Sequence, residues 1–549
     1  MAKLGLCSRC KGVNAGDRPE DQPVACTMFE GGLCSACKER KAVRKKIQQL
    51  EEEITKPKAK HHSLGSRINA IHDPFIHRLP PEISSYIFRL CFPTLNFESS
   101  HLWNEAAAFT GVLNLGAVCR KWRQLAWTTP HLWDTIFITI QPSTRRSLAE
   151  TLPDLLREWL SRSGMRPLTI FFRYSGCSEG SDSSDLSMLS YKCAGKALDS
   201  AADLVIEVIN LHSGRWRNLH LDVGPDIPER FCGSIQPTQL LFLDLAMDGG
   251  SSPTLKFVMK SKPFPTQLAL TNFPPTMVDI GWDNITRAIL WDLTADECLE
   301  VLQRAPVLEY CMAELWDNHD VTVNLGTIIL HQRLRSLNSS YDGTRFFEAI
   351  NVPSLEEWVH DIRGYPLPMT AMVSLLERSG CCLKILDLQN ISAPPNDLSK
   401  LFQAMPSLER LILRFGSVKN ADGVMDDILA RIFNSPSSNS TIPSEDANHE
   451  SFLPYLQFIE CMTSCGMAPF SWNHIPQLYR QGHRHSLMLV SAAKESHISD
   501  ETALELLKLT NDGVNLQIVD TTTRARGDFL ANFRKKVFSL SSTDSLQRR

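Results

Sequence analysis

The sequence predicts an α/β protein in which an all-α helical module is followed by an irregular α/β solenoid. Three observations predict this class: two amphipathic helical patterns within residues 76–133, leucine motifs that recur from residue 216 onward, and a cysteine-rich start followed by a short helix. A chain of 549 residues exceeds one ordinary hydrophobic core, so several structural units are expected.

Composition and charge narrow the possible functions. The net charge of −4 and the pI near 6.5 give no electrostatic footprint for nucleic acid. No apolar run approaches the length of a membrane span, and the first residues, MAKLGLCSRC, lack the apolar core of a signal peptide. We therefore expect an intracellular protein, in the cytoplasm or the nucleus, whose 16 cysteines are mostly reduced.

The first unit, residues 1–37, carries two C-x-x-C pairs separated by 23 residues. Two such turns can supply four thiolates to one tetrahedral zinc ion, as in a zinc ribbon or treble clef. The candidate ligands of one structural Zn²⁺ are Cys7, Cys10, Cys34 and Cys37. The alternative is a cysteine-containing tail that binds no metal.

Residues 38–56 follow as a short helix, rich in helix formers and free of glycine and proline. Val43, Ile47, Leu50 and Ile54 are spaced four, three and four apart, which is typical of a coiled coil. The seam covers less than three heptads, which is marginal for dimerisation on its own. We expect residues 57–75 to be a linker, since they open with Pro57 and a polar run.

Residues 76–133 contain two helical halves. In the first, Pro81 and Glu82 suit a first turn, and Ile83, Ile87 and Leu90 form an apolar stripe. The second half repeats the stripe with Leu115, Val118, Trp122 and Leu125. Two short helices with this much apolar surface expose a surplus that usually binds a partner.

The spacing of these motifs resembles that of the F-box family. The matching segments are LPPE at residues 79–82, IFRL at 87–90, VCRKWR at 118–123 and PHLW at 130–133. The resemblance implies docking on a Skp-type adaptor, and through it on a cullin-based ubiquitin ligase. About twenty residues, 92–112, separate the halves where a compact F-box has a tighter turn. The positions implied for adaptor binding or for the core of the module are Leu79, Pro80, Ile83, Ile87, Phe88, Val118, Trp122 and Trp133. The alternative is a helical hairpin inside a larger core.

Residues 134–520 are interpreted as a leucine-rich-repeat-like domain. The form L-x-x-L-x-L, or a degenerate version of it, begins at Trp216, Leu240, Leu383 and Leu408, with weaker copies at Leu308, Leu334, Leu355 and Leu456. The intervals of 21 to 28 residues are those of units built from a short strand and a helix. Helices are predicted over 151–163, 296–304, 369–378 and 396–404. Polar loops are expected near 175–187 and 435–450, and a basic tail over 521–549. The alternative is an unrelated fold with alternating strands and helices.

No catalytic motif is found in the chain: it has no nucleophile elbow, no phosphate-binding glycine loop and no His-Glu-x-x-His helix. We therefore predict a non-catalytic substrate receptor that presents an unknown protein for ubiquitination. The competing hypotheses are a zinc-containing nucleic-acid or chromatin regulator, which would use the cysteine unit and the basic helix after it, and a repeat scaffold outside any ligase.

Overall fold

In the computed structural model the chain forms two compact units. Residues 1–88 and 113–126 belong to what we call the helical unit, and residues 89–112 and 127–549 belong to the sheet unit. The residues that the structure describes are 35–72, 79–92, 111–175, 188–224, 226–247, 256–315, 328–341, 343–363, 365–391, 395–416, 425–435, 452–463, 467–481, 484, 486–493, 498–520 and 527–535.

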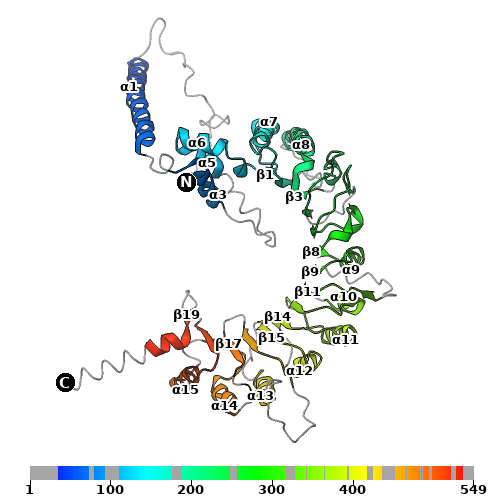
Figure 1. Ribbon diagram of the computed structural model, residues 1–549. Coiled ribbons are helices and arrows are strands. Elements are labelled where there is room, and N and C mark those ends of the chain that lie inside the picture. Colours follow the sequence, from blue (N-terminus) through cyan, green and yellow to red (C-terminus); the bar gives the residue numbers. More distant parts are fainter. Residues whose placement is uncertain are drawn as a thin grey trace, which may run out of the picture. The chain divides into compact units, whose positions relative to one another are not determined.

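Helices make up the described part of the helical unit. They are α1 (Ser35–His72), α3 (Pro81–Leu90), α5 (Gly111–Val118) and α6 (Arg120–Trp127), and Figure 1 draws them in blue and cyan. The last residues of α3, the first residues of α5 and the end of α6 already belong to the sheet unit.

The observed bounds of helix α1 differ from the helix predicted over 38–56 and the linker predicted over 57–75. It begins at Ser35, inside the second C-x-x-C pair, and runs through Pro57 to His72, over most of the expected linker. Proline lacks the N–H that would bond to the carbonyl four residues earlier, and for that reason it predicts the end of a helix. The helix continues beyond it because the following residues, KAKHHSLGSRINAIH, again include good helix formers.

The second helical half of residues 76–133 also differs from the prediction. The stripe from Leu115 to Leu125 predicts one helix, but the structure breaks it at Cys119 into α5 and α6. The Cys119 carbonyl accepts a hydrogen bond from the Arg123 N–H at 2.9 Å, and its thiol accepts one from the Trp122 N–H at 3.4 Å. Cys119 therefore caps the start of α6, in the way that serine caps many helices.

The sheet unit is built on a 15-stranded sheet whose strands follow one another in sequence order. Neighbouring strands pair in parallel, except for the last pair, which is antiparallel. The strands are β1 (Thr135–Ile140), β2 (Leu168–Tyr174), β3 (Trp216–Val223), β4 (Phe242–Ala246), β6 (Gln267–Thr271), β8 (Arg287–Leu293), β9 (Tyr310–Leu315), β11 (Ser336–Ser340), β13 (Glu357–Asp361), β14 (Ile385–Ile391), β15 (Arg410–Phe415), β16 (Phe458–Thr463), β17 (Met488–Ala493), β18 (Leu516–Asp520) and β19 (Gly527–Asp528).

Two small two-stranded sheets accompany the large one, β5 (Phe257–Val258) with β7 (Val278–Asp279) and β10 (Ile329–Leu330) with β12 (Ile350–Asn351). The helices of the sheet unit lie together on one side of the strands (Figure 1). They are α7 (Arg146–Arg162), α8 (Met188–Leu211), α9 (Ala295–Arg304), α10 (Thr344–Ala349), α11 (Met369–Ser379), α12 (Pro395–Gln403), α13 (Asp426–Asn434), α14 (Ile475–Gln481) and α15 (Asp500–Asn511).

One continuous hydrophobic core lies between the sheet and its helices, from Ile136 to Phe533. Alternation along each strand selects the residues that enter it: in β3, Leu219 and Leu221 are buried on the helix side, while Asn218 and Asp222 on the opposite face are half-buried. We call that opposite face, which the helices leave uncovered, the open face of the sheet.

The leucine motifs predict strand positions well. The leading leucine of seven motifs lies two residues before a strand and is buried there: Leu240, Leu308, Leu334, Leu355, Leu383, Leu408 and Leu456. The predicted helices at 296–304 and 369–378 correspond to α9 and α11. A capping box between Thr294 and Glu297 begins α9, and Gly380, with a left-handed φ of 56°, ends α11.

These elements confirm a mixed α/β chain in which a helical region precedes a strand-rich one. The leucine motifs do not predict strands β6 and β8, because Pro265 and Ile285 stand where the leading leucine would be. Apart from the bounds of α1, the predicted domain limits stay predictions. The predicted polar loops lie almost wholly outside the described residues, as does most of the basic tail.

Candidate functional site

Helix α3 carries the first half of the candidate site. Pro80 and Pro81 lead into the helix, and the Pro80 carbonyl accepts a hydrogen bond from the Ser84 N–H at 3.1 Å. Phe88 turns inward and is 1% exposed. On the other side of the helix, Ile83 is 47% and Tyr86 58% exposed. An apolar stripe of this size on a short helix remains open to solvent.

Phe88 and Trp122 form the core of the helical unit. Their ring centroids lie 4.9 Å apart with the planes tilted by 45°, so α3 and α6 pack through this pair. Helix α6 is joined to α5 by the Arg123 guanidinium, whose Nε donates a hydrogen bond to the Gly116 carbonyl at 2.8 Å. These contacts hold three short helices that would not be stable singly.

Helix α5 adds a second exposed set. Leu113 and Val118 are each 49% exposed, close to the value for Ile83. The sequence patterns do not single out Leu113, because it directly follows residues interpreted as an insertion. The signal in the sequence that could have identified Leu113 is the apolar pair Val112–Leu113 shortly before Leu115.

The predicted site residues therefore separate into three groups. Pro80, Ile83 and Val118 are exposed; Leu79, Ile87 and Trp122 are half-buried; Phe88 and Trp133 are buried. A buried side chain cannot contact an adaptor directly, so Phe88 can serve only as a core position. The first two groups provide the candidate contact surface.

Trp133 belongs to the sheet unit, where it is 0% exposed. Its ring contacts Trp127 at 5.3 Å and Trp159 of α7 at 4.6 Å, both edge-on. The Arg162 guanidinium lies 4.6 Å from both the Trp127 and the Trp133 rings, a cation–π arrangement. Trp133 thus anchors the start of the sheet unit and not the helical surface.

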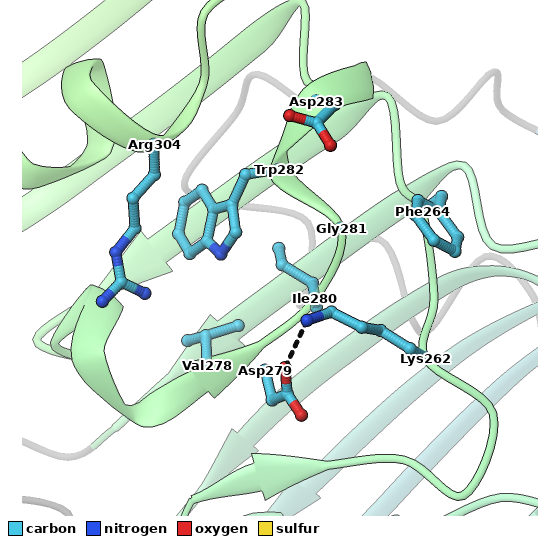
Figure 2. A pocket seen from close by; sticks show the side chains of 9 residues that line it. All are labelled: Lys262, Phe264, Val278, Asp279, Ile280, Gly281, Trp282, Asp283 and Arg304. Atoms are coloured by element: carbon cyan, nitrogen blue, oxygen red, sulfur yellow. Dashed lines mark ion pairs between the residues drawn. The ribbon is translucent and has the colours of Figure 1, made fainter.

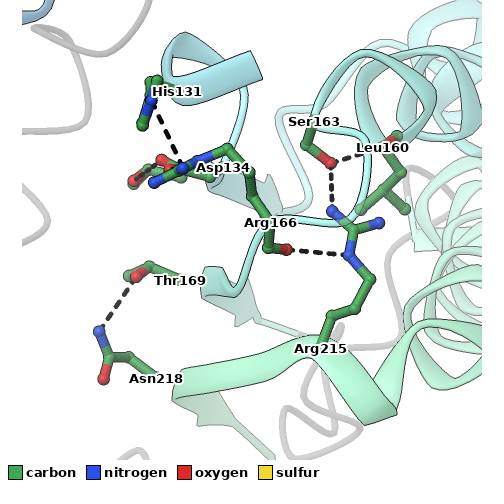
Figure 3. Close-up of polar contacts among 9 residues, drawn as sticks. His131, Asp134, Leu160, Ser163, Arg166, Thr169, Arg215 and Asn218 are labelled. Carbon is green, nitrogen blue, oxygen red and sulfur yellow. Dashed lines mark hydrogen bonds and ion pairs between the residues drawn. The ribbon is translucent and has the colours of Figure 1, made fainter. Parts of the chain in front are cut away.

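A chain of arginine contacts follows at the beginning of the first three strands (Figure 3). Arg166 Nε donates to Asp134 Oδ2 at 2.8 Å, and Arg215 Nε donates to the Arg166 carbonyl at 2.9 Å. Arg215 Nη2 also donates to the Ser163 hydroxyl at 2.5 Å. Burial lowers the pKa of Arg215. The network ties the segments that lead into β1, β2 and β3 together.

An open pocket of about 500 Å³ lies in the sheet unit beside β7 (Figure 2). Its lining includes the apolar side chains of Val278, Ile280 and Trp282, and one ion pair, in which Lys262 Nζ lies 2.7 Å from Asp279 Oδ1. The Arg304 guanidinium lies 5.4 Å from the centroid of the Trp282 ring. The lining residues include no serine, threonine, cysteine, histidine or tyrosine, so the pocket provides no side-chain nucleophile of these types.

The four predicted zinc ligands cannot be compared with the structure. Cys7, Cys10 and Cys34 lie outside the described residues, and of Cys37 only the backbone is described, in α1. Among the side chains that the structure does describe, no group of three or more His, Cys, Asp or Glu could hold a metal ion. The zinc site stays a prediction.

None of the described helices combines the length and the hydropathy that a membrane crossing requires.

A comparison with protein families finds a match to part of the chain. The family model described as "F-box-like" matches residues 76–139, a span that includes α3, α5, α6 and most of β1. No curated protein is similar enough to the chain to count as a relative. The chain therefore contains an F-box-like domain at the position that the sequence motifs indicated.

Proposed function

We propose that this protein is a substrate receptor of a cullin-based ubiquitin ligase, with its F-box-like domain docked on a Skp-type adaptor. The observation that carries the proposal is the coincidence of the F-box-like match at 76–139 with the solvent-exposed apolar side chains of α3 and α5. F-box-like domains generally bind adaptors of this type and occur in subunits that do no chemistry themselves.

The energetics of the helical unit support a partner at this place. Ile83, Tyr86, Leu113 and Val118 are each about half exposed. Covering such side chains yields roughly 25 cal/mol for each Å² of apolar area removed from water. Interface cores are apolar and rim positions polar, and the basic residues Arg120 and Lys121 lie close to Val118 in sequence.

We further propose that the sheet unit is a leucine-rich-repeat-like solenoid that binds the protein to be ubiquitinated. Its in-order parallel strands, many of them preceded by a buried leucine, support this assignment. The open face of the sheet is the proposed binding surface.

The side chains of the open face suit protein recognition. Phe137, Phe171 and His220 stack across β1, β2 and β3 with centroids 4.3 and 4.1 Å apart. Phe171 and His220 are buried, so of these three side chains only the half-buried Phe137 is open to a partner. Farther along, Arg414 of β15 lies between Asp387 at 2.9 Å and Glu460 at 3.1 Å. Aromatic and arginine side chains supply most hot spots of protein interfaces.

The receptor would act by proximity. It would contribute no bond-making residue and would raise the local concentration of substrate lysines near a recruited ubiquitin-charged enzyme. The absence of a catalytic motif in the sequence agrees with this role.

The test is binding of the full chain to a purified Skp-type adaptor, measured by calorimetry. The double variant Ile83→Asp with Val118→Asp places two charges on the exposed surface and should weaken binding by about 10-fold or more, because an unpaired charge in an interface core is costly. Circular dichroism would verify that the variant folds.

The matched control is Leu148→Asp with Leu155→Asp on α7. These leucines are 49% and 56% exposed, so the chemistry and the exposure are closely matched but the site differs. The control should bind the adaptor within about 2-fold of the native chain, as exposed substitutions away from an interface normally do. A native chain that does not bind the adaptor would remove the proposal.

We also propose that Cys7, Cys10, Cys34 and Cys37 hold one structural zinc ion. The expected result is about one zinc per chain after purification in mild chelator, falling to near zero in Cys7→Ser with Cys34→Ser. The zinc content of the native chain and of the variant is measured by atomic emission. Zinc close to zero in the native chain would contradict the proposal and, with it, the alternative of a zinc-containing nucleic-acid regulator.

A further inference from the structure

The helix α1 is 38 residues long and leaves its apolar side chains open to solvent. Within the part of the chain that the structure describes, every side chain from 38 to 64 is exposed. The exposed fraction is 54% for Val43, 51% for Ile47, 43% for Leu50 and 50% for Ile54. A single helix that exposes its apolar seam in this way is marginal in water.

The apolar seam continues beyond the stretch that the sequence pattern predicts. Leu64 and Ile68, 44% and 55% exposed, fall in the same heptad register as Ile47, Leu50 and Ile54. Between residues 43 and 68, the a positions of that register are Ile47, Ile54, His61 and Ile68, and the d positions are Val43, Leu50, Pro57 and Leu64. Because α1 runs unbroken through Pro57, the seam extends over more than three heptads.

The identity of the seam residues selects one kind of assembly. Three of these four a positions are isoleucine, and the d positions include two leucines. β-Branched residues at a with leucine at d favour a parallel coiled coil of two strands. The polar His61 at an a position would help to set the register.

The flanking charges are complementary between two parallel copies. In a parallel pair, each g residue faces the e residue five positions later on the other helix. These pairs are Glu39 with Arg44, Lys46 with Glu51, and Glu53 with Lys58. All three join opposite charges, and each occurs twice in a symmetric dimer.

From the register, the seam and the charges, we infer that α1 pairs with α1 of a second copy of this chain in a parallel, in-register coiled coil, so that the protein is a homodimer. Each dimer would then carry two F-box-like domains and two sheet units. The inference rests on α1 alone, and it holds or fails separately from adaptor binding.

The first experiment measures the mass of the full chain by light scattering at micromolar concentration. The native protein should have twice the 61.7 kDa of one chain. Ile47→Asp with Leu50→Asp buries charge in the seam and should raise the dissociation constant about 50-fold or more, which gives monomer. A native chain that is monomeric would overturn the inference.

The matched control is Gln48→Asp with Gln49→Asp. These residues lie between the seam residues in sequence but face away from the seam, at b and c. The control introduces the same two charges into the same turn of helix, so it should stay dimeric. A seam variant that remains as dimeric as this control would show that α1 does not hold the dimer.

A second experiment tests the orientation through the pair Glu53 and Lys58. In parallel helices, Glu53→Lys alone and Lys58→Glu alone each create two like-charge contacts and should weaken the homodimer several-fold. In a mixed dimer of the two variants, one helix carries lysine and the other glutamate at both positions, so both contacts join opposite charges and the mixed dimer should form preferentially. Unweakened Lys58→Glu homodimers, or no preference for the mixed dimer, would overturn the parallel arrangement.

Discussion

Replacing Trp358 with alanine should lower the free energy of unfolding of the sheet unit by about 3–5 kcal/mol. Trp358 lies on the helix side of β13 and is 0% exposed. Its ring meets Phe347 of α10 edge-on at a centroid distance of 5.0 Å. The indole Nε1 also donates a hydrogen bond to the Ser339 hydroxyl at 3.3 Å.

The large effect has two physical sources. Truncation removes the apolar contacts of the largest side chain in this part of the core, and it leaves a cavity that the neighbouring strands cannot close without moving. The aromatic contact with Phe347 is lost as well, along with the hydrogen bond to Ser339. Urea titration followed by circular dichroism would measure the change.

The control for this prediction is Val359→Ala. Val359 is the next residue of β13, and it points to the open face of the sheet, where it is only half-buried. Its truncation should cost less than about 1 kcal/mol because no core cavity forms. If Trp358→Ala unfolded at the same urea concentration as Val359→Ala, the assignment of the core side of β13 would be wrong.

Replacing Arg378 with methionine should lower the free energy of unfolding of the sheet unit by about 3 kcal/mol or more. Arg378, in the last turn of α11, donates from Nη2 to the carbonyls of Phe347 and Ile350, both at 2.7 Å, and from Nε to Ile350 at 3.0 Å. Phe347 lies in the last turn of α10 and Ile350 is the C-cap residue that follows it, so these carbonyls are at the helix end, where intrahelical N–H donors are lacking. The guanidinium thus caps the neighbouring helix and faces the negative end of its dipole.

Methionine keeps most of the apolar stem of arginine, so the change isolates the lost hydrogen bonds. Two carbonyls would be left without this donor, and each such loss costs roughly 1–3 kcal/mol. The adjacent Glu377, which is exposed, provides the control: Glu377→Gln should change stability by less than about 0.5 kcal/mol. Thermal unfolding of the two variants side by side checks the prediction, which fails if Arg378→Met melts with the control.

Local patterns in the sequence account for much of the sheet unit. The leading leucines of the motifs, such as Leu383 and Leu408, place the strands because each must be buried for the turn before the strand to pack. The helices are predictable from their periodicity and from their caps, such as Gly380 after α11. The F-box-like domain is predictable from motif spacing, and the match to residues 76–139 supports it.

Other features depend on contacts between residues far apart in the chain. Trp133 has the same local signature as an F-box residue, but its packing against Trp159 of α7 places it in the sheet unit. Strands β6 and β8 lack the leucine signature and exist because they complete the hydrogen bonding between β4 and β9.

The sequence by itself determined the class of the fold, the F-box-like motifs and the positions of most leucine motifs, because these follow from periodicity, capping and turn chemistry between residues close together in the chain. Only the tertiary structure decided which apolar side chains of α3 and α5 remain exposed, where Cys119 divides two helices, and how far α1 extends past Pro57. The physical reason is that a side chain is buried or exposed according to neighbours that folding brings to it, and a local pattern carries no record of them.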